Sequence, residues 1–279
     1  QAYFCAHHVS TAMSRCEAAL AALAFLDTLK FSCDTTGSLL RSDCPDCGKA
    51  VRLYCSKCVQ SVIPLPQPLD LGLQVLILRH PKEAAAKSSA TPLPLLSRDI
   101  EVCEWQSNSC PENCGAMGPG TWLVFPSQDA IDASLVDWSQ VTGLVLVDSR
   151  WKHARAVVED PKLQLQQLPA MKLGPNDGFD ASRFWRSTTE KLADVRGLLS
   201  TTECLHSLLQ LRQRSQGGEE GRLDDLLFFF ALRLQLVVQE YQDDPERCCP
   251  WCTENQRRRA VHAGNDRKRK EDMATAAEK

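Results

Sequence analysis

The hydrophobic positions of the chain change their pattern at about Leu73. Beyond that residue, short apolar runs alternate with helical stretches, and each run ends at polar or turn-forming residues. Three of these runs are 75–78, 122–125 and 144–147. Strands buried on both faces of a parallel sheet have this appearance. The pattern therefore predicts an α/β domain built on a parallel sheet.

Helical patterns lie around these strands. Apolar residues recur every three or four positions over Thr11–Lys30, which is typical of an amphipathic helix. A second helix is expected in KHARAVVED, residues 152–160. A third, about Leu223–Gln242, contains the apolar run LLFFFAL, and Arg233 within it argues for a core helix rather than a membrane helix.

Cysteines and prolines divide the chain before the sheet domain. The segment IPLPQP has too few backbone N–H groups for regular structure, so we interpret it as a linker. Asn, Pro and Gly around three cysteines suggest an inserted loop further on. The expected organisation is an N-terminal helical segment (1–43), a zinc-knuckle module (44–63), the sheet domain (70–244) with an inserted loop at about 99–120, and a basic disordered tail (245–279).

Charge is distributed unevenly along the 279 residues. The formal net charge is −3, but residues 257–279 hold eight basic and four acidic side chains, which leaves −7 for the rest. Residues 150–196 have nine Lys or Arg against six Asp or Glu. Any nucleic-acid binding must therefore be local. No apolar run approaches the roughly 20 residues of a membrane helix, so a soluble protein without membrane association is expected.

Fourteen cysteines make metal binding the first chemical expectation. Cys44, Cys47, Cys55 and Cys58 form C-x2-C-x7-C-x2-C, and four thiolates suit a structural zinc ion with no open coordination position. Two disulfides or free thiols are the alternatives. A second zinc ion is arithmetically possible from the remaining candidates, Cys103, Cys110, Cys114, Cys249 and Cys252.

The two ends of the chain bear on localisation. No secretory signal opens the sequence, which favours a reducing compartment, although a start at Gln1 leaves room for a lost targeting segment. The tail carries RRR (257–259) and RKRK (267–270). This reads as a nuclear import signal, with an RNA-contacting arm or plain solvated disorder as alternatives. We expect a nuclear protein, or otherwise a cytoplasmic one.

Candidate chemistry gathers where strands end. Asp148 follows LVLV, and ligands of open α/β sheets bind at the carboxyl ends of strands; an N-cap is the alternative role for this residue. The segment RHPKEAAAKSSA (79–90) offers cations and two adjacent hydroxyls for phosphate contacts, or forms a solvated helix and turn. RFWR (183–186) mixes arginine with aromatics as RNA-binding surfaces do, or buries its rings in the core. LLSTTEC places Ser200 or Thr201 at a helix start, where Glu203 would close a capping box.

Taken in chain order, these pieces resemble the DTW-domain proteins, the tRNA-uridine aminocarboxypropyltransferases, and especially the branch with two C-x2-C knuckles. The elements that carry the resemblance are YCSKC (54–58), HPKE with KSSA (80–90), LVFPSQDA (123–130), LVDSRW (within 145–151), FWR (184–186), LLSTTEC (198–204) and DDLLFFF (224–230). The resemblance implies a SPOUT-like knotted α/β fold. It also implies transfer of the 3-amino-3-carboxypropyl group of S-adenosylmethionine to N3 of a tRNA loop uridine.

The resemblance also implies roles for particular residues. Asp148, Trp151 and Glu203 would be catalytic, with Asp148 as general base, Glu203 as its reserve and Trp151 stacking on a base. The cofactor would be held by Pro126, Ser127, Asp148, Leu199, Ser200 and Thr201. RNA would be contacted by His80, Lys87, Arg150, Arg183 and Arg186. The partner is then tRNA, and the protein is a monomer or a homodimer.

One departure from the family pattern matters more than the other, which is Cys204 in place of the usual Ala after Glu203. The motif that names the family is Asp-any-Thr-Trp, and here Asp148 and Trp151 are present while Arg150 stands at the third position. Arg150 would add a phosphate or carboxylate contact, or it marks a zinc-containing tRNA-binding protein with weakened catalysis. A SPOUT-like RNA methyltransferase is the remaining alternative.

Overall fold

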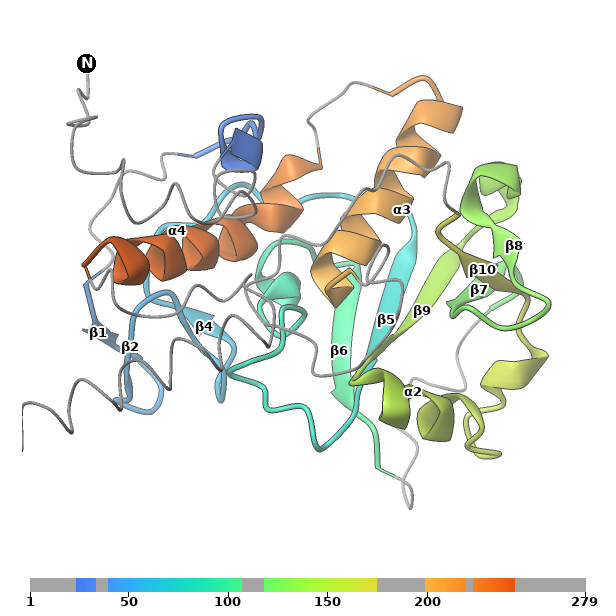
Figure 1. Cartoon of the computed structure of the whole chain (residues 1–279), viewed down its shortest axis with the longest axis horizontal. Helices are drawn as coiled ribbons and strands as arrows, with labels where there is room; N and C mark the ends of the chain where they lie inside the picture. The colour runs from blue at the N-terminus through green and yellow to red at the C-terminus, as the bar shows by residue number, and fades with distance from the viewer. Residues whose placement is uncertain (1–23, 34–39, 107–117, 175–198, 219–222, 244–279) are drawn as a thin grey trace, which may run out of the picture. The chain divides into compact units, whose positions relative to one another are not determined.

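The structure is a computed structural model that describes residues 24–33, 40–106, 118–174, 199–218 and 223–243. The chain divides into two compact units, and the larger comprises Lys30–Ser182 and Arg196–Phe230. The sheet, the cysteine module and the helices that flank the sheet all belong to this larger unit (Figure 1). The smaller unit contributes residues 24–29 and 231–243 to the described part.

A six-stranded parallel sheet forms the centre of the larger unit, which confirms the predicted fold class (Figure 1). In sheet order the strands are β6 (Ile100–Glu104), β5 (Gln74–Arg79), β9 (Gly143–Asp148), β7 (Thr121–Val124), β10 (Ala170–Lys172) and β8 (Ile131–Asp132), and every neighbouring pair is parallel. The runs predicted at 75–78, 122–125 and 144–147 are β5, β7 and β9. The SPOUT-like knot stays a prediction.

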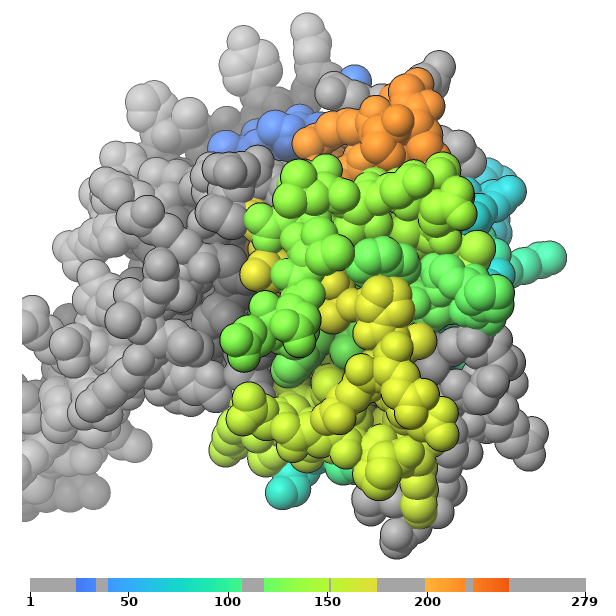
Figure 2. Space-filling model, turned by 90° about the vertical axis from the view of Figure 1, so that its right-hand side faces the viewer, coloured from blue at the N-terminus to red at the C-terminus, as the bar shows by residue number. Residues whose placement is uncertain are grey.

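The central strand β9 is buried on both faces, as its uninterrupted apolar sequence requires. Leu76 of β5 lies opposite Val145 of β9, and both join one apolar cluster with Val157 and Val158 of α2 (Trp151–Val158). The other helix, α3 (Thr201–Ser215), also contacts β9. Figure 2 views the larger unit from the β8 side, where residues 118–174 (green and yellow) form one surface beneath α3 (orange).

The predicted helices agree with the structure where it describes them. Residues 152–160 form α2 and its C-terminal turn. The helix expected over 223–242 begins with a 3-10 turn, η7 (Asp224–Leu227), and continues as α4 (Phe228–Asp243). The other 3-10 turns are η2 (Leu93–Leu95), η4 (Ala133–Leu135), η5 (Trp138–Gln140) and η6 (Leu165–Gln167). Of the helix predicted over 11–30, only residues after 23 are described, and 24–26 are helical.

One predicted boundary is wrong and others lie outside the described residues. The loop expected over 99–120 starts with strand β6, because Ile100–Glu104 pairs in parallel along the whole of β5. Residues 107–117 of that loop, the tail 245–279 and the segment 183–186 are not among the described residues. The remaining domain bounds stay predictions. None of the described helices has the length and apolar character needed to span a bilayer.

The cysteine module consists of two small hairpins. β1 (Ser42–Asp43) pairs with β2 (Ala50–Val51), and β3 (Tyr54–Cys55) pairs with β4 (Gln60–Ser61), both antiparallel. Behind the second hairpin, the ring of Tyr54 packs edge-on against Phe229, with centroids 5.1 Å apart. The module is therefore joined to the aromatic start of α4 by ring contacts.

Candidate functional site

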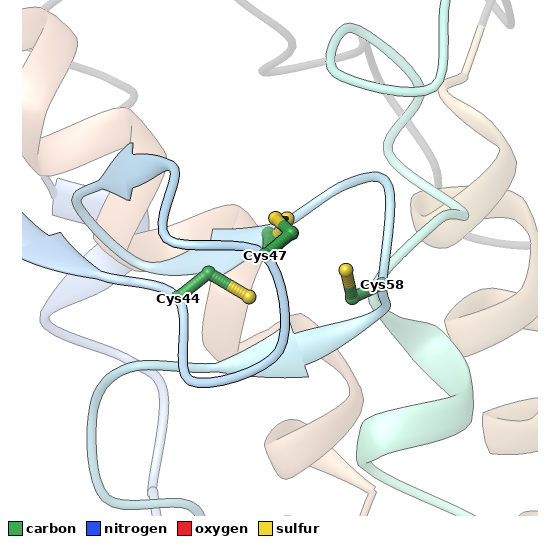
Figure 3. Close-up of side chains that lie close together, drawn as sticks. Cys44, Cys47 and Cys58 are labelled. Carbon is green, nitrogen blue, oxygen red and sulfur yellow. Dashed lines mark hydrogen bonds between the residues drawn. The ribbon is translucent and has the colours of Figure 1, made fainter.

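The four cysteines of the module come together as predicted. Their sulfur atoms all lie within 4.8 Å of one another, and Figure 3 shows the thiols of Cys44, Cys47 and Cys58 directed into the same small space. Cys44 and Cys55 are buried, Cys58 is half-buried and Cys47 is exposed. All four are free cysteines. The structure therefore favours a metal-binding cluster over the alternative of two disulfides.

The two C-x2-C pairs have the same backbone conformation. The N–H of Gly48 donates to the carbonyl of Cys44 (2.9 Å), and the N–H of Val59 donates to the carbonyl of Cys55 (2.8 Å). Gly48 and Val59 both have positive φ, 67° and 51°. A left-handed conformation suits glycine but costs a β-branched residue about 1–2 kcal/mol. The turn of the second C-x2-C pair thus repeats the turn of the first, with local backbone strain at Val59. The spacing of the cysteines alone did not predict this repeat.

The cluster also fits the ligand geometry of zinc. Zinc–sulfur bonds of about 2.3 Å in a tetrahedron separate the sulfur atoms by about 3.8 Å, and the sulfurs of Cys47 and Cys55 are 3.6 Å apart. Hydrogen bonding by the backbone N–H of Cys58 is the largest cause that lowers the pKa of the Cys55 thiol, to about 6, whereas the hydrogen bond with Cys47 is the largest cause that raises the pKa of the Cys58 thiol, to about 12. Thiolates are the ligand form. The donor set and its spacing therefore suit a structural metal ion.

Asp148 occupies the carboxyl end of β9, the strand between β5 and β7. Its side chain is 6% exposed. The hydroxyl of Ser88 donates to Oδ2 (2.6 Å), and the hydroxyl of Thr201 donates to Oδ1 (2.7 Å). Each carboxylate oxygen therefore has one short hydrogen bond, from two segments that lie 60 and 53 residues away in the sequence.

The Ser88 hydroxyl has a fixed direction. Its oxygen accepts hydrogen bonds from the backbone N–H groups of Ala90 (3.1 Å) and Thr91 (3.2 Å). Because a hydroxyl oxygen has two acceptor sites, these bonds leave its proton to donate to Asp148. The expectation that this hydroxyl contacts phosphate is therefore wrong, since Ser88 is buried and directed into the protein.

The ionisation of Asp148 reflects two opposed influences. Burial disfavours the charged carboxylate and raises its pKa above the ordinary value for aspartate. The hydrogen bonds from Ser88 and Thr201 favour the charged form and lower the pKa, but burial is the larger effect. A carboxylate with a raised pKa at the end of a central strand has the character of a general base.

The structure rules out the N-cap alternative for Asp148. The N-cap of α2 is Arg150, whose side chain makes no capping hydrogen bond. Trp151 is the first residue of α2, and its side chain is not among those described. The Asp148 carboxylate instead accepts from Ser88 and from Thr201, the first residue of α3.

The capping box predicted at the start of α3 is confirmed. Ser200 is the N-cap, and its hydroxyl accepts from the N–H of Glu203 (3.3 Å), while Glu203 Oε2 accepts from the N–H of Ser200 (2.8 Å). Glu203 is 7% exposed. This buried capping role gives the carboxylate a structural function, which weakens its case as the reserve base.

The loops predicted to hold a cofactor converge on the carboxyl edge of the sheet. Val124 of β7 lies opposite Leu146 of β9, so Pro126 follows at the level of Asp148. Pro126 is exposed, whereas Ser127, Leu199 and Ser200 are half-buried. Because Thr201 bonds directly to Asp148, the start of α3 reaches the same edge. Three segments that are distant in sequence thus meet at one place.

The predicted RNA-contacting residues differ in accessibility. Lys87 and Arg150 are exposed. His80 is 7% exposed, and its Nδ1 accepts from the N–H of Lys82 (3.0 Å). This geometry supports a packing role for His80 rather than phosphate contact. Arg183 and Arg186 lie outside the described residues.

The aspartates of DDLLFFF have a structural role. Asp224 accepts from the N–H of Lys30 (2.9 Å) and lies 3.3 Å from His206 Nε2. Asp225 accepts from the N–H and the hydroxyl of Ser32. Both carboxylates therefore hold the segment before the cysteine module in place. The sequence singled out this motif without indicating its partners.

Cys103, one candidate for a second zinc site, lies on β6. Its thiol donates to Glu101 Oε1 (3.1 Å). Its four proposed companions lie outside the described residues, so a second metal site stays a hypothesis.

Known proteins resemble this chain in sequence and to a limited extent in structure. Proteins named tRNA-uridine aminocarboxypropyltransferase 1 from Xenopus tropicalis and Rattus norvegicus are each 24% identical, over 71% of this chain and 79% and 78% of theirs. A solved structure titled as the SAM-dependent rRNA:acp-transferase Tsr3 from Vulcanisaeta distributa aligns with a TM-score of 0.38 and 18% identity, covering 62% of this chain and 82% of that one.

The family assignment rests on a longer match. The family model described as DTW domain matches residues 41–237. This range begins just before the cysteine module, includes the whole six-stranded sheet and the Asp148 site, and ends within α4. The module and the sheet are thus parts of one recognised domain, and this chain belongs to the DTW domain family.

Proposed function

We propose that this protein is an enzyme that transfers the 3-amino-3-carboxypropyl group of S-adenosylmethionine to N3 of a uridine in a tRNA loop. The observation that carries the proposal is the buried Asp148 carboxylate, held by Ser88 and Thr201 at the carboxyl end of the central strand. The names of the relatives from Xenopus tropicalis and Rattus norvegicus support the substrate and the transferred group.

The reaction requires N3 of the uracil ring to lose one proton. S-adenosylmethionine, the co-substrate, would supply an electrophilic methylene next to its sulfonium. The N3 lone pair would form the new C–N bond as the C–S bond breaks, and the electron pair of the C–S bond would stay on sulfur. The N3 proton passes to the carboxylate of Asp148. Each Asp148 oxygen accepts one hydroxyl proton and retains a second acceptor site for the substrate N–H.

The residues around Asp148 would hold the cofactor and orient the carboxylate. Pro126 and Ser127 lie beyond β7, and Leu199 and Ser200 lie beside Thr201, on the same sheet edge. Ser127, Leu199 and Ser200 are half-buried, which offers a partly apolar surface with hydroxyls and backbone polar groups. This composition fits a nucleoside with a polar side chain.

We also propose that Cys44, Cys47, Cys55 and Cys58 bind one structural zinc ion. Four sulfur ligands leave no open coordination position, so the site does not take part in the transfer. Its role is to hold two hairpins that are too short to be stable alone.

The transferred group can be identified directly. Purified protein is incubated with unmodified tRNA and S-adenosylmethionine that is labelled either in the methyl carbon or in the aminocarboxypropyl carbons. We expect label in RNA only from the second cofactor. Label from the methyl group alone would establish a methyltransferase and refute the proposal.

The same assay tests the alternative that Arg150 favours, a tRNA-binding protein without turnover. Arg150 is the N-cap of α2 and makes no capping hydrogen bond. A threonine at this position would cap the helix, so the departure from the family motif affects α2 rather than the Asp148 carboxylate. Binding of tRNA without transfer of either label would support the alternative.

We propose nuclear localisation on the basis of the two basic clusters at 257–259 and 267–270. Their composition, not the described structure, supports this. Deletion of residues 257–279 is expected to move a fluorescent fusion out of the nucleus, and an unchanged distribution would contradict the proposal.

A further inference from the structure

A stacked pair of histidine rings lies at the carboxyl edge of the sheet, next to α2. His80 follows β5, and His153 belongs to α2; their ring centroids are 4.8 Å apart and the planes differ by 19°. Trp105 also contacts His80, at 5.1 Å and 40°. The N–H of His80 donates to the carbonyl of Asp148 (3.0 Å), so this aromatic group is hydrogen-bonded to the backbone of the proposed general base.

The inner rings of this group are fixed by their partners. His80 is buried and its Nδ1 accepts from the N–H of Lys82. The indole N–H of Trp105 donates to Asp160 Oδ2 (2.8 Å). His153 is the outer member, half-buried, with its ring supported on His80. A flat ring held rigidly from behind and partly open to solvent is suited to stacking on another ring.

Exposed cations surround His153. Lys82, Arg150 and Lys152 are all exposed. Arg150 is the N-cap of α2 and Lys152 precedes His153 within it, while the backbone N–H of Lys82 donates to His80, whose ring stacks on His153. Burial is the main cause that lowers the pKa of His153, and these three cations lower it further. Of the acidic groups in this region, Glu159 pairs with Arg155 (3.5 Å), Glu104 pairs with Arg79 (2.7 Å), Asp160 accepts from Trp105, and Glu83 is half-buried beside Lys82. Lys82, Arg150 and Lys152 therefore place three exposed cations around the His153 ring.

We propose that this surface, the His153 patch (Lys82, Arg150, Lys152 and His153), binds single-stranded RNA. A base stacks on the His153 ring, and the three cations contact the flanking phosphates. Stacking on aromatic faces within a positive groove is how proteins hold unpaired nucleotides. The inference rests on the proposed function and deepens it, because Arg150 lies two residues after Asp148. The nucleotide on His153 is thus a neighbour of the modified uridine.

Binding of unmodified tRNA without cofactor tests the patch independently of catalysis. Kd is measured at several salt concentrations for His153→Ala, His153→Phe and the double variant Lys82→Ala/Lys152→Ala. Arg98→Ala is the matched control, because Arg98 is exposed just before β6 and therefore lies at the amino edge of the sheet. Circular dichroism verifies that each variant is folded.

Three results are expected if the patch binds RNA. His153→Ala weakens binding about 5- to 100-fold, and His153→Phe restores it because the ring remains. The double variant weakens binding and reduces the slope of log K against log salt by about 0.7 for each lost phosphate contact. Arg98→Ala binds as the wild type does.

The opposite results overturn the inference. Wild-type affinity in both His153→Ala and the double variant refutes the patch, as does an equal loss in Arg98→Ala. A paired duplex that binds as tightly as a hairpin loop of the same length refutes single-strand recognition. The labelled-cofactor assay separates the two proposals: patch-dependent binding without transfer refutes the enzyme alone, whereas normal binding and transfer by the variants refute the patch alone.

Discussion

The cysteine module and the Asp148 site differ in how the chain builds them. All four sulfur ligands come from one stretch of 15 residues, residues 44–58, and each pair is shaped by its own turn. Asp148 takes its hydrogen bonds from Ser88 and Thr201, which lie 60 and 53 residues away. The first site is local and the second depends on the completed sheet.

This difference explains the division of roles. A local cluster of four thiols can form around a metal ion before the rest of the fold is complete, and it is then chemically closed. The Asp148 site exists only when β5, β9 and α3 are in place, and its carboxylate keeps acceptor capacity for a substrate. Stability and reactivity should therefore be separable by substitution.

The largest effect is expected from Cys55→Ser. Cys55 is buried within the cluster, and a structural zinc site contributes about 10 kcal/mol or more to folding. Metal content should fall well below one per chain, and Tm should fall by about 10 °C or more. Elemental analysis and thermal denaturation measure both.

Cys103→Ser provides the control for that substitution. Cys103 is a half-buried cysteine on β6 whose thiol donates to Glu101, outside the cluster. The substitution Cys103→Ser should leave metal content unchanged. Equal metal content in Cys55→Ser and the wild type would refute the proposal that the module binds a metal ion.

The next largest effect is expected from Asp148→Asn. The amide oxygen can still accept from Ser88 and the NH2 can donate to Thr201, so the fold is retained. Loss of the base should lower transfer about 10²- to 10⁴-fold, with metal content unchanged. Undiminished transfer would exclude Asp148 as the base, and lost metal would show that the two sites are not separable.

The pH dependence of the same pair of proteins provides a second readout. Because burial raises the pKa of Asp148, the acid limb of the wild-type kcat/KM profile should lie above the ordinary aspartate value of about 3.9. Because the pKa of Asp148 is raised in the folded state, the contribution of its protonated form to protein stability is lost as pH rises through that pKa. Relative to Asp148→Asn, the wild type should therefore lose Tm as pH rises. Parallel Tm curves would contradict this ionisation.

The contrast between the two sites also determines what the sequence could predict. Apolar runs located β5, β7 and β9 because strands buried on both faces are apolar throughout, and spacing located the cysteine cluster because each C-x2-C turn is local. The edge strand β6 was missed because its exposed face carries polar residues, as in Ile100–Glu104. The expected phosphate contact of Ser88 was wrong for a different reason. Ser88 donates to Asp148 because β5 and β9 are neighbours in the sheet, and the order of strands cannot be predicted from a local sequence pattern.

A smaller effect is expected from Ser88→Ala. The change removes a hydrogen bond that lowers the pKa of Asp148, so the acid limb should move to higher pH. It also leaves the buried N–H groups of Ala90 and Thr91 without their acceptor, at a cost of about 1–3 kcal/mol. A decrease of about tenfold in kcat/KM is expected.

Ser89→Ala separates positioning from simple destabilisation. Ser89 binds the start of α3 through Thr202, whose N–H donates to the Ser89 hydroxyl (3.3 Å). The hydroxyls that donate to Asp148 in the described part of the chain are those of Ser88 and Thr201, not that of Ser89. Ser89→Ala should lower Tm without moving the acid limb. A shift of equal size in both variants would show that Ser88 acts through general loosening of the loop.

The smallest effect is expected from Arg150→Thr, which restores the family motif. Arg150 is the N-cap of α2 without a side-chain cap, and threonine at an N-cap stabilises a helix by about 1 kcal/mol. Tm should rise by about 2–4 °C while tRNA affinity falls, because one cation of the His153 patch is lost.

Arg150→Ala is the control: it removes the same charge without adding a cap, so it should weaken tRNA binding equally with no gain in Tm. If Arg150→Thr instead raises the transfer rate at saturating tRNA, then position 150 acts on the Asp148 site itself, and the helix cap is not the reason for the threonine in the motif.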